Sequence, residues 1–429
     1  MTDSATLSYN GHRFDLPVVV GTQNEAAIDI RKLRESSGLI TLDDGYSNTG
    51  SCSSAITYVN GEKGILKYRG YLIEVLATKS SFIETAYLLI FGELPTAVQL
   101  SEFRRLLTQH EFIHEDMRHH FDGFPPNAPP MAILSAMVNA VGSFHPDFMA
   151  PENDEHFIEP AARLMSKIRT IAAASYRKSI GKPMIYPRSN LRYTANFLHM
   201  MFSKPYELFE ADETVVTALD RLLILHADHE QNCSTSTVRM VASARANLYG
   251  SVAAGICALW GPLHGGANVA AIEMLARLHE SGEPLGRFVE RVKRNGSDAR
   301  LMGFGHRVYK NFDPRARILK TACDRMLEKL GIRDPLLDLA KRLEEIALDD
   351  PYFIERRLYP NVDYYSGIIM RAIGIPTNMF TVMFAIGRLP GWIAHWREVH
   401  TNPHARIDRP RQVYTGPRIR EYLPIEQRG

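Results

Sequence analysis

Cysteine is scarce in this chain of 429 residues, and its few copies are widely separated. The four are Cys52, Cys233, Cys257 and Cys323, and no two of them form a Cys-x-x-Cys pair. A disulfide framework and a thiolate metal site are therefore not expected. A reducing cytoplasm is the predicted location.

Long apolar runs and an excess of one charge are lacking as well. The most apolar segments, such as Val252–Trp260 and Phe380–Ile386, are far shorter than the roughly 20 residues that cross a bilayer. The N-terminal residues lack the basic and then apolar regions of a signal peptide. Lys and Arg total 50 against 48 Asp and Glu, so the net charge of +2 gives no reason to expect nucleic acid or a membrane as the main partner.

What is present is the composition of a folded protein with helical periodicity. Hydrophobic residues make up 45% of the chain, which is typical of a globular protein, and the length allows two domains. A long helix is predicted over Glu159–Ile180, with Pro160 in its first turn and Gly181 after its end. Further helices are predicted to start at the N-cap residues Asp212, Asn268, Asp313 and Asp334. Because strands and helices do not alternate regularly, the predicted fold class is mainly α.

Two short β-hairpins are predicted near the N-terminus. Each is centred on an Asn-Gly pair, Asn10-Gly11 or Asn60-Gly61, which tolerates the positive φ angles of a tight turn. The flanking strands are Thr6–Tyr9 with His12–Leu16, and Ala55–Val59 with Gly64–Arg69.

Three regions are dense in side chains that can perform chemistry. They are HADHEQN (His226–Asn232), GPLHGGAN (Gly261–Asn268), and a pair formed by GFGHRVYKNFDPR (Gly303–Arg315) and YPNVDYYSG (Tyr359–Gly367). A carboxylate can remove a proton, and histidines can donate hydrogen bonds or protons to carbonyl oxygens. Glycines beside a histidine let a bulky ligand approach the backbone.

Each region also has a purely structural interpretation. A histidine beside an apolar helix is more often a hydrogen-bonded structural residue than a catalytic one. Asp363 can be an ordinary N-cap, and Gly265-Gly266 can be a simple turn before a helix. Gly303-Phe304-Gly305 lacks a complete phosphate-binding pattern. The residues alone do not show that these distant regions meet.

Two other functions remain open on the residues alone. A metal-dependent hydrolase would use His226, Asp228, His229 and Glu230, although their crowding gives no established metal-ligand spacing. A non-catalytic helical scaffold is the other.

Five stretches, in one order, resemble the citrate synthase family over almost the whole chain. They are ILHADHEQN with STSTVR, LWGPLHGGAN, MGFGHRVYKNFDPRA, LYPNVDYYSGI and RPRQVYTG. The resemblance implies the citrate synthase fold, with a large helical domain over 1–271 and 379–429 and a small helical domain over 272–378. The N-terminal β-hairpin region covers about 1–70. Length and hairpins resemble the longer form of Gram-negative bacteria, which is typically a hexamer built from dimers.

The resemblance implies condensation of acetyl-CoA with oxaloacetate, followed by hydrolysis of the thioester, with no metal or other cofactor. Asp363 matches the base that takes a proton from the acetyl methyl group. His264 matches the residue that hydrogen-bonds the thioester carbonyl, and His306 matches the acid that polarises the oxaloacetate ketone. The nearest alternative is 2-methylcitrate synthase, which uses propionyl-CoA and whose members usually lack much of this N-terminal region.

The resemblance also assigns residues that bind substrate. His229, Arg315 and Arg388 match groups that hold oxaloacetate, while Leu263 and Lys310 fall where the family contacts CoA. Arg409 matches an arginine that the neighbouring subunit supplies, so a homo-oligomer with at least two copies is implied. The basic run formed by Arg406, Arg409, Arg411, Arg418 and Arg420 has two further interpretations, a solvated tail or a nucleic-acid contact.

An effector site is implied more weakly. Longer citrate synthases are often inhibited by NADH, and His110, Arg163 and Lys167 match positions that contact the nucleotide. However, Gln109, Glu111 and His145 differ from the usual residues, and Glu111 would oppose a phosphate. We therefore predict weak or absent inhibition by NADH.

Overall fold

The computed structural model describes residues 3–145, 157–294, 299–306 and 308–428. The chain forms two compact units, Met1–Ser53 with Asp408–Gly429, and Ser54–Ile407. The predicted borders between a large and a small domain, at residues 272 and 378, lie inside the second unit and stay a prediction.

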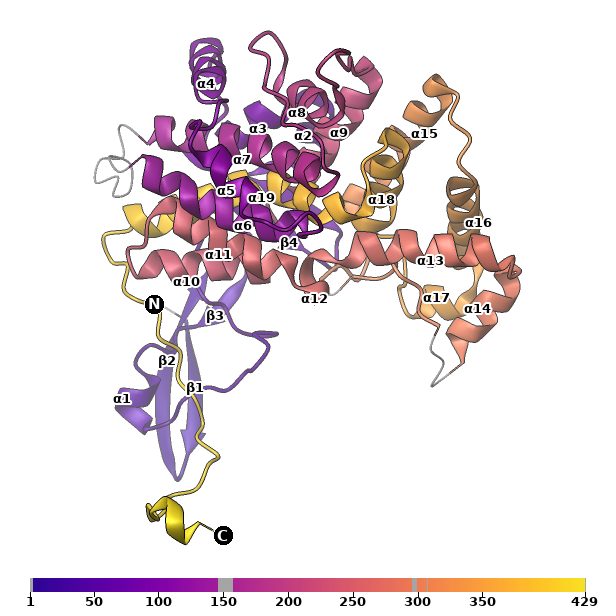
Figure 1. Ribbon diagram of the computed structural model, residues 1–429. Helices are drawn as coiled ribbons and strands as arrows, with labels where there is room; N and C mark the ends of the chain where they lie inside the picture. The colour runs from indigo at the N-terminus through magenta and orange to yellow at the C-terminus, as the bar shows by residue number, and fades with distance from the viewer. Residues whose placement is uncertain (1–2, 146–156, 295–298, 307, 429) are drawn as a thin grey trace. The chain divides into compact units, whose positions relative to one another are not determined.

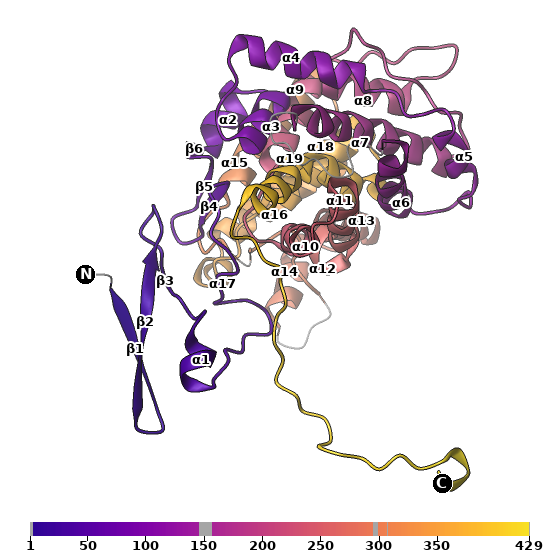
Figure 2. The ribbon, with the colours of Figure 1, turned by 90° about the vertical axis from the view of Figure 1, so that its left-hand side faces the viewer.

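The first unit contains the first predicted hairpin. Strand β1 (Ser4–Tyr9) pairs antiparallel with β2 (His12–Val20), and the short β3 (Ala26–Ile28) continues the sheet. The turn between β1 and β2 has φ angles of 48° and 78° at Asn10 and Gly11, so the predicted Asn-Gly turn is confirmed. Figure 2 shows this hairpin, the short α1 (Leu33–Ser37), and the C-terminal segment, which is extended except for the 3₁₀ turn η5 (Ile425–Gln427).

The second hairpin differs from its prediction. Strands β4 (Thr57–Asn60) and β5 (Ile65–Tyr68) pair antiparallel, and β6 (Tyr71–Leu72) follows. Asn60 pairs with Ile65, so the loop has four residues and the predicted tight Asn60-Gly61 turn is wrong.

Gly61 has a tertiary function instead. A Cβ atom on Gly61 would lie 2.0 Å from the carbonyl oxygen of Val308, and the Gly61 carbonyl accepts a hydrogen bond of 2.8 Å from the Lys310 backbone N–H. The hairpin therefore packs closely against the loop that follows His306.

The rest of the second unit is helical, which confirms the predicted mainly α fold. Its helices are α2 (Ile73–Lys79), α3 (Phe82–Phe91), α4 (Ala97–Gln109), α5 (Met117–Asp122), α6 (Pro130–Val141), η1 (Gly142–Phe144), α7 (Ile158–Ser179), α8 (Tyr193–Phe202), α9 (Glu213–His226), α10 (Cys233–Ser243), α11 (Leu248–Trp260), α12 (Pro262–Gly265), α13 (Ala267–Ser281), α14 (Leu285–Lys293), α15 (Pro314–Leu330), α16 (Pro335–Asp349), α17 (Pro351–Glu355), α18 (Val362–Ile373), η4 (Thr377–Met379) and α19 (Phe380–Thr401). Among the described residues, no helix is both long and apolar enough to cross a bilayer.

Most of the predicted helix starts are confirmed. The side chains of Asp212, Asp313 and Asp334 each accept a hydrogen bond from a backbone N–H in the first turn of α9, α15 and α16. Gly331 ends α15 at a φ of 62°, as a C-terminal glycine does. The predicted long helix agrees with α7 to within one residue at each end.

Two predicted caps are wrong. Helix α13 begins at Ala267, directly after the four-residue α12, so Asn268 lies within its first turn. Gly266 is the N-cap residue because its carbonyl already accepts the first helical hydrogen bond, from Ala270. The interpretation of Asp363 as an N-cap also fails, since Asn361 caps α18 and Asp363 is the second helical residue.

Helix α19 lies at the centre of the second unit, as Figures 1 and 2 show. It is buried along most of its length and packs against α3, α7, α9, α10 and α11. Pro390 interrupts its hydrogen-bond ladder, and the next N–H, of Gly391, donates instead to the Ala227 carbonyl at 3.1 Å. A Cβ atom on Gly391 would lie 2.3 Å from Asp228 Oδ1, so only glycine permits this approach.

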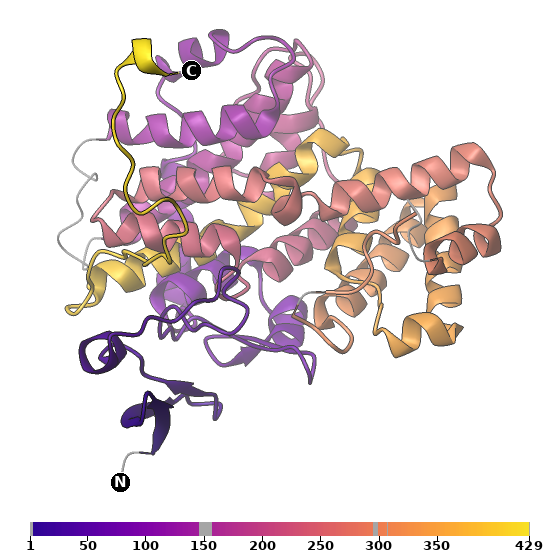
Figure 3. The ribbon, with the colours of Figure 1, turned by 90° about the horizontal axis from the view of Figure 1, so that it is seen from below.

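A second helical layer begins where α11 ends. Figures 1 and 3 show α11, α12 and α13 following one another along one side of the unit. Helix α13 packs on α16 and α18, and α15 packs on both α18 and α9. The residues between these layers form the candidate site.

Candidate active site

The loop after α9 is held by buried hydrogen bonds. Helix α9 ends at His226, whose Nδ1–H donates to the Leu222 carbonyl at 2.7 Å. The hydroxyl of Tyr68 donates to the Asp228 carbonyl at 2.9 Å, and Asp228 Oδ2 accepts from the Glu230 backbone N–H at 3.1 Å. Glu230 has a φ of 55°, so the helix does not continue, and the loop presents His229 instead.

Asp228 belongs to a buried chain of polar groups. Its Oδ1 lies 3.4 Å from Nε2 of His395, and Arg239 donates to Nδ1 of the same histidine at 3.1 Å. Because a guanidinium group can only donate, the His395 proton is on Nε2, where it faces the carboxylate. This chain anchors the loop to α10 and α19.

The four side chains of the metal-hydrolase alternative do not converge. His226 bonds to a carbonyl of its own helix, Asp228 faces His395, and His229 faces Tyr309. Within the described ranges, no group of three or more His, Cys, Asp or Glu side chains is arranged to hold a metal ion.

His264 is fixed on the short helix α12. Its Nε2 accepts a hydrogen bond from the Ser234 backbone N–H at 3.1 Å, and the Ser234 hydroxyl lies 2.9 Å away. The proton of the neutral ring is therefore on Nδ1, where it can be donated to a ligand. Burial, assisted by the positive charge of Arg388, lowers the pKa of His264 to about 4, so the ring is neutral at pH 7.

His306 is oriented by the loop that follows it. Its Nδ1 accepts hydrogen bonds from the backbone N–H groups of Val308 at 3.0 Å and Tyr309 at 3.2 Å. Its proton is therefore on Nε2. Nη2 of Arg315 lies 3.5 Å from that nitrogen, and because both groups are then donors, this approach is not a hydrogen bond. Burial, followed by the charge of Arg315, lowers the pKa of His306 to about 4.

Backbone pairing connects His306 with Asp363. The segment Gly303–Gly305 bonds to Tyr359–Asn361: Asn361 N–H donates to the Gly303 carbonyl at 2.9 Å, and Gly305 N–H donates to the Tyr359 carbonyl at 2.7 Å. Gly303 has a φ of 80°, and a Cβ atom there would lie 2.9 Å from the Tyr364 ring. The two predicted catalytic residues thus stand on paired segments.

Asp363 has the properties of a base. It lies in the first turn of α18, and its side chain is partly buried. Burial raises the pKa of its carboxyl group to about 6, although the charges of Arg315 and Arg388 act in the opposite direction. A carboxylate with a pKa near 6 is poised to accept a proton at neutral pH.

Two buried guanidinium groups complete the arrangement. Arg315 is held by Asp313 through two hydrogen bonds of 3.0 Å, and Asp313 also accepts from the Val362 N–H at 3.2 Å. Arg388 donates from Nε to the His226 carbonyl at 2.7 Å, while its buried Nη1 has no hydrogen-bond partner among the described residues. An unpaired buried N–H donor of this kind is suited to a ligand carboxylate.

The positive charge of Arg388 acts on the pKa values of several of these groups. It contributes to the lowered pKa of both His264 and His229 and it stabilises the ionised form of Asp363. The structure therefore brings together the predicted residues His229, His264, His306, Arg315, Asp363 and Arg388. A base, two neutral N–H donors and two guanidinium groups can bind a dianion and remove a proton beside a carbonyl group.

The comparisons with known proteins agree with this chemistry. The family model described as citrate synthase, C-terminal domain, matches residues 45–411. The chain belongs to the citrate synthase family. Citrate synthase 1 of Mycobacterium tuberculosis is 54% identical over 426 residues, which are 99% of both chains. The citrate synthase of Corynebacterium glutamicum is 50% identical over 427 residues, 99% of this chain and 98% of that one.

Solved structures of citrate synthases share the fold. The crystal structure of citrate synthase from Pyrobaculum aerophilum is 38% identical with a TM-score of 0.81, and the match covers 96% of this chain and 97% of that one. The ternary complex of the Thermoplasma acidophilum citrate synthase with carboxymethyl coenzyme A and oxaloacetate is 31% identical with a TM-score of 0.81, and covers 90% of this chain and 100% of that one. The predicted enzyme class, an acyltransferase, is confirmed, and the scaffold alternative is wrong.

One part of the resemblance is not supported. The Mycobacterium and Corynebacterium relatives are Gram-positive enzymes, whereas the sequence was expected to be of the Gram-negative hexameric type. Both relatives match 99% of this chain, so the N-terminal length on which that expectation rested does not separate the two types.

Other predicted residues lie outside the cluster or stay untested. Leu263 is fully exposed on α12, and Lys310 is exposed in the loop after His306, so their contact with CoA stays a prediction. Arg409 belongs to the first unit and its function in a neighbouring site also stays a prediction. Three contacts of the site were not predicted from the sequence. Tyr68 holds the loop after α9, Asp313 holds Arg315, and Tyr309 bonds to His229.

The predicted effector residues lie together on α7 and the end of α4. Glu159 contacts both His110, at 3.2 Å, and Arg163, at 2.7 Å. Lys167 donates to the Phe112 carbonyl, and burial lowers its pKa to about 8. The Glu111 carboxylate is buried against Arg169 and Asn196, at 3.3 and 3.2 Å, so its negative charge is already paired and the argument that it would oppose a phosphate is not supported.

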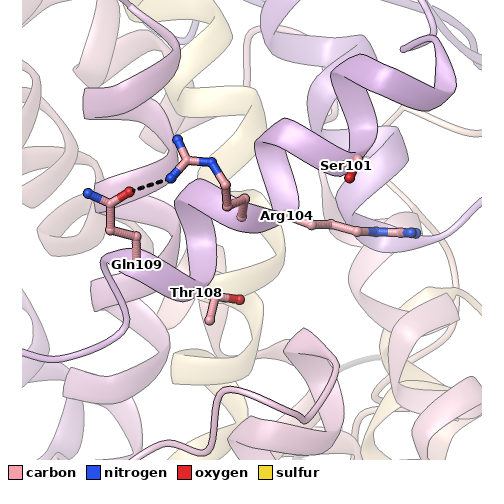
Figure 4. A pocket seen from close by; sticks show the side chains of 5 residues that line it. Ser101, Arg104, Thr108 and Gln109 are labelled. Carbon is pink, nitrogen blue, oxygen red and sulfur yellow. Dashed lines mark hydrogen bonds between the residues drawn. The ribbon is translucent and has the colours of Figure 1, made fainter.

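A surface pocket along α4 carries no site. It is lined by Ser101, Arg104, Arg105, Thr108 and Gln109, all of which are exposed. Figure 4 shows this pocket from close by. Arg105 is already bonded to Gln109, at 2.9 Å, and to Glu102. None of the catalytic candidates lines this pocket.

Proposed function

We propose that this enzyme condenses acetyl-CoA with oxaloacetate and hydrolyses citryl-CoA to citrate and CoA, the reaction by which acetyl groups join the tricarboxylic acid cycle. The observation that carries the proposal is the buried cluster in which Asp363, a carboxylate of raised pKa, accompanies the neutral histidines His264 and His306. A cytoplasmic location, supported by the scarcity of cysteine, belongs to the same proposal.

The proposed reaction uses these three groups in order. Asp363 removes a proton from the acetyl methyl group while His264 donates from Nδ1 to the thioester oxygen, where negative charge develops. The resulting enolate carbon forms a bond to the ketone carbon of oxaloacetate, and the ketone oxygen takes the proton of His306 Nε2. Water then cleaves the thioester of citryl-CoA, with its oxygen going to the acyl carbon and a proton to the CoA sulfur, which yields citrate and CoA. The proton on Asp363 is released and His306 regains one, so both groups return to their starting state.

Oxaloacetate binding relies on the guanidinium groups. The substrate has two carboxylates, and arginine binds such groups through paired, charge-assisted hydrogen bonds. Arg388 offers its buried Nη1, and Arg315 is held in place by Asp313. The complex of the Thermoplasma enzyme with oxaloacetate and a CoA analogue supports this choice of substrates.

The first test is CoA release from acetyl-CoA, followed with a thiol reagent, with and without oxaloacetate. We expect release only when oxaloacetate is present. With propionyl-CoA, kcat/KM is expected to be about 10- to 200-fold lower, because an added methylene must be excluded by the acyl pocket. A preference for propionyl-CoA would identify a 2-methylcitrate synthase, and no release with either thioester would refute the proposal.

The proposed assembly is a homo-oligomer with a dimer as its minimum. The C-terminal segment exposes large apolar side chains, with Val413 52%, Ile419 92% and Tyr422 82% exposed. Burying these side chains against another protein surface would remove apolar area from water. The proposed partner is a second copy of the chain, and Arg409 of each copy acts in the site of the other.

Weak or absent inhibition by NADH is also proposed, through His110, Arg163 and Lys167. Glu159 supports a low affinity for NADH. Its carboxylate already pairs with His110 and Arg163, so a phosphate of the nucleotide would have to displace it. Inhibition is measured as CoA release at increasing NADH concentration. A constant in the low micromolar range, as of a tight effector, would contradict the proposal.

A further inference from the structure

Tyr309 is buried within an otherwise exposed loop. Its side chain is 2% exposed, whereas Val308 is 39% exposed and Lys310 is also on the surface. Burying a phenol is favourable when its hydroxyl finds a hydrogen-bond partner. For Tyr309 that partner is Nε2 of His229, at 3.2 Å.

The ring of Tyr309 lies among the groups that are proposed to bind oxaloacetate. Its centroid is 4.9 Å from that of His306 and 5.5 Å from that of His229. The guanidinium carbon of Arg315 lies 5.6 Å from the same centroid, within the range of a cation–π contact. One residue thus contacts three of the proposed ligands of the substrate.

The ring of His229 is buried and packs against His306, with 5.4 Å between the ring centroids, and the hydroxyl of Tyr309 adds a hydrogen bond to it. Among the described residues, the hydroxyl of Tyr309 forms a hydrogen bond with Nε2 of the His229 imidazole. A neutral imidazole has one donor and one acceptor nitrogen, and rotation of the ring would present the wrong one to a substrate oxygen. A hydrogen bond to one nitrogen holds the other in a defined direction.

We propose that Tyr309 is a positioning residue for oxaloacetate: its hydroxyl fixes the imidazole of His229, and its ring fills the space between His229, His306 and Arg315. The inference rests on the proposed function, because it takes oxaloacetate as the ligand of His229. Asp363 and the acetyl-CoA side of the reaction are not involved. Loss of the hydroxyl therefore affects oxaloacetate binding more than the chemical step.

The test is a double-mutant cycle on CoA release. Tyr309→Phe keeps the ring and removes only the hydroxyl, so KM for oxaloacetate is expected to rise about 3- to 10-fold. At saturating oxaloacetate, kcat and KM for acetyl-CoA are expected to stay within about 2-fold of the parent values. In the His229→Gln background the same change is expected to have no further effect on KM for oxaloacetate, since the hydroxyl acts through His229.

The matched control is Tyr193→Phe. Tyr193 is also buried, and its hydroxyl donates to the Met165 carbonyl at 2.8 Å. Neither residue belongs to the candidate site. This variant is expected to unfold at a lower temperature without a change in KM. An unchanged KM in Tyr309→Phe, or an equal rise in both His229 backgrounds, would overturn the inference.

A second measurement needs no substitution at residue 309. In enzyme labelled with ¹⁵N-histidine, the His229 ring, assigned by its loss in His229→Gln, is expected to be neutral and in one tautomer between about pH 6 and 8. A mixture of tautomers would overturn the inference. Parent enzyme that releases no CoA with oxaloacetate would instead refute the proposed function, so the two failures are distinguishable.

Discussion

Replacing Asp363 with Asn is expected to lower kcat for oxaloacetate-dependent CoA release by about 10²- to 10⁴-fold. The amide has the shape of the carboxyl group but cannot accept the methyl proton, and the buried histidines are already neutral and serve as donors. Oxaloacetate binding, measured by calorimetry, is expected to persist because Arg315 and Arg388 are unchanged. Activity within about tenfold of the parent enzyme would show that another group is the base.

The loss cannot be attributed to unfolding. Burial raises the pKa of Asp363 from 3.8 to about 6, so the folded protein holds this proton more tightly than the unfolded chain does. The free energy of unfolding therefore falls as the pH rises from about 4 to about 6, and the full cost is present above pH 6. That cost is at most about 3 kcal/mol, and the partial exposure of the side chain reduces it. Asp363→Asn removes the charge, so its melting temperature at pH 7 is expected to equal or exceed that of the parent.

The same pKa sets the acid limb of the activity. For the parent enzyme, kcat/KM is expected to fall about tenfold per pH unit below about pH 6, as Asp363 becomes protonated. His264 and His306, with pKa values near 4, stay neutral over most of this range and contribute little to the limb. A control variant, Asp334→Ala, removes the capping carboxylate of α16 and should leave the profile unchanged while destabilising the protein by about 1 kcal/mol.

A dimer that combines Asp363→Asn in one subunit with Arg409→Ala in the other is expected to recover about half of the parent activity. Each homodimer of these variants is expected to be nearly inactive. In the mixed dimer, if Arg409 acts in the neighbouring site, one site has both defects and the other has an intact Asp363 and an intact Arg409. Co-expression with two different affinity tags yields the mixed dimer, and CoA release measures its activity.

The alternative gives an opposite result. If Arg409 serves the site of its own subunit, both sites of the mixed dimer are defective and no activity returns. Arg418→Ala is a matched control, because it removes another exposed arginine of the C-terminal segment and is expected to leave the homodimer active. Full activity of Arg409→Ala itself would remove Arg409 from the site altogether.

Local signals in the sequence predicted local structure well. Asp313-Pro314 and Asp334-Pro335 open helices because the capping carboxylate and the fixed φ of proline act within one turn. The Asn10-Gly11 turn is equally local. The Asn60-Gly61 prediction failed because that glycine is required by the backbone of Val308, almost 250 residues further along the chain, a contact that no local pattern records.

The site was predicted by resemblance, whereas its physical properties come from tertiary contacts. Spacing alone does not reveal that the Ser234 N–H selects the tautomer of His264 or that Asp313 holds Arg315. Tyr309 was missed for the same reason, since its hydrogen bond joins residues that are 80 positions apart. Glu111 shows the converse: a charge that looked unfavourable for a ligand is neutralised by Arg169.

The junction between α19 and the loop after α9 determines when the site can be completed during synthesis. Arg388 donates to the His226 carbonyl across 162 residues, and Gly391 N–H supplies the partner of the Ala227 carbonyl. At about 5–20 residues per second, a ribosome delivers α19 roughly 8 to 30 s after this loop. Until then the apolar faces of the helices that surround α19 lack their central partner. The nascent chain therefore stays open to aggregation until α19 has been synthesised.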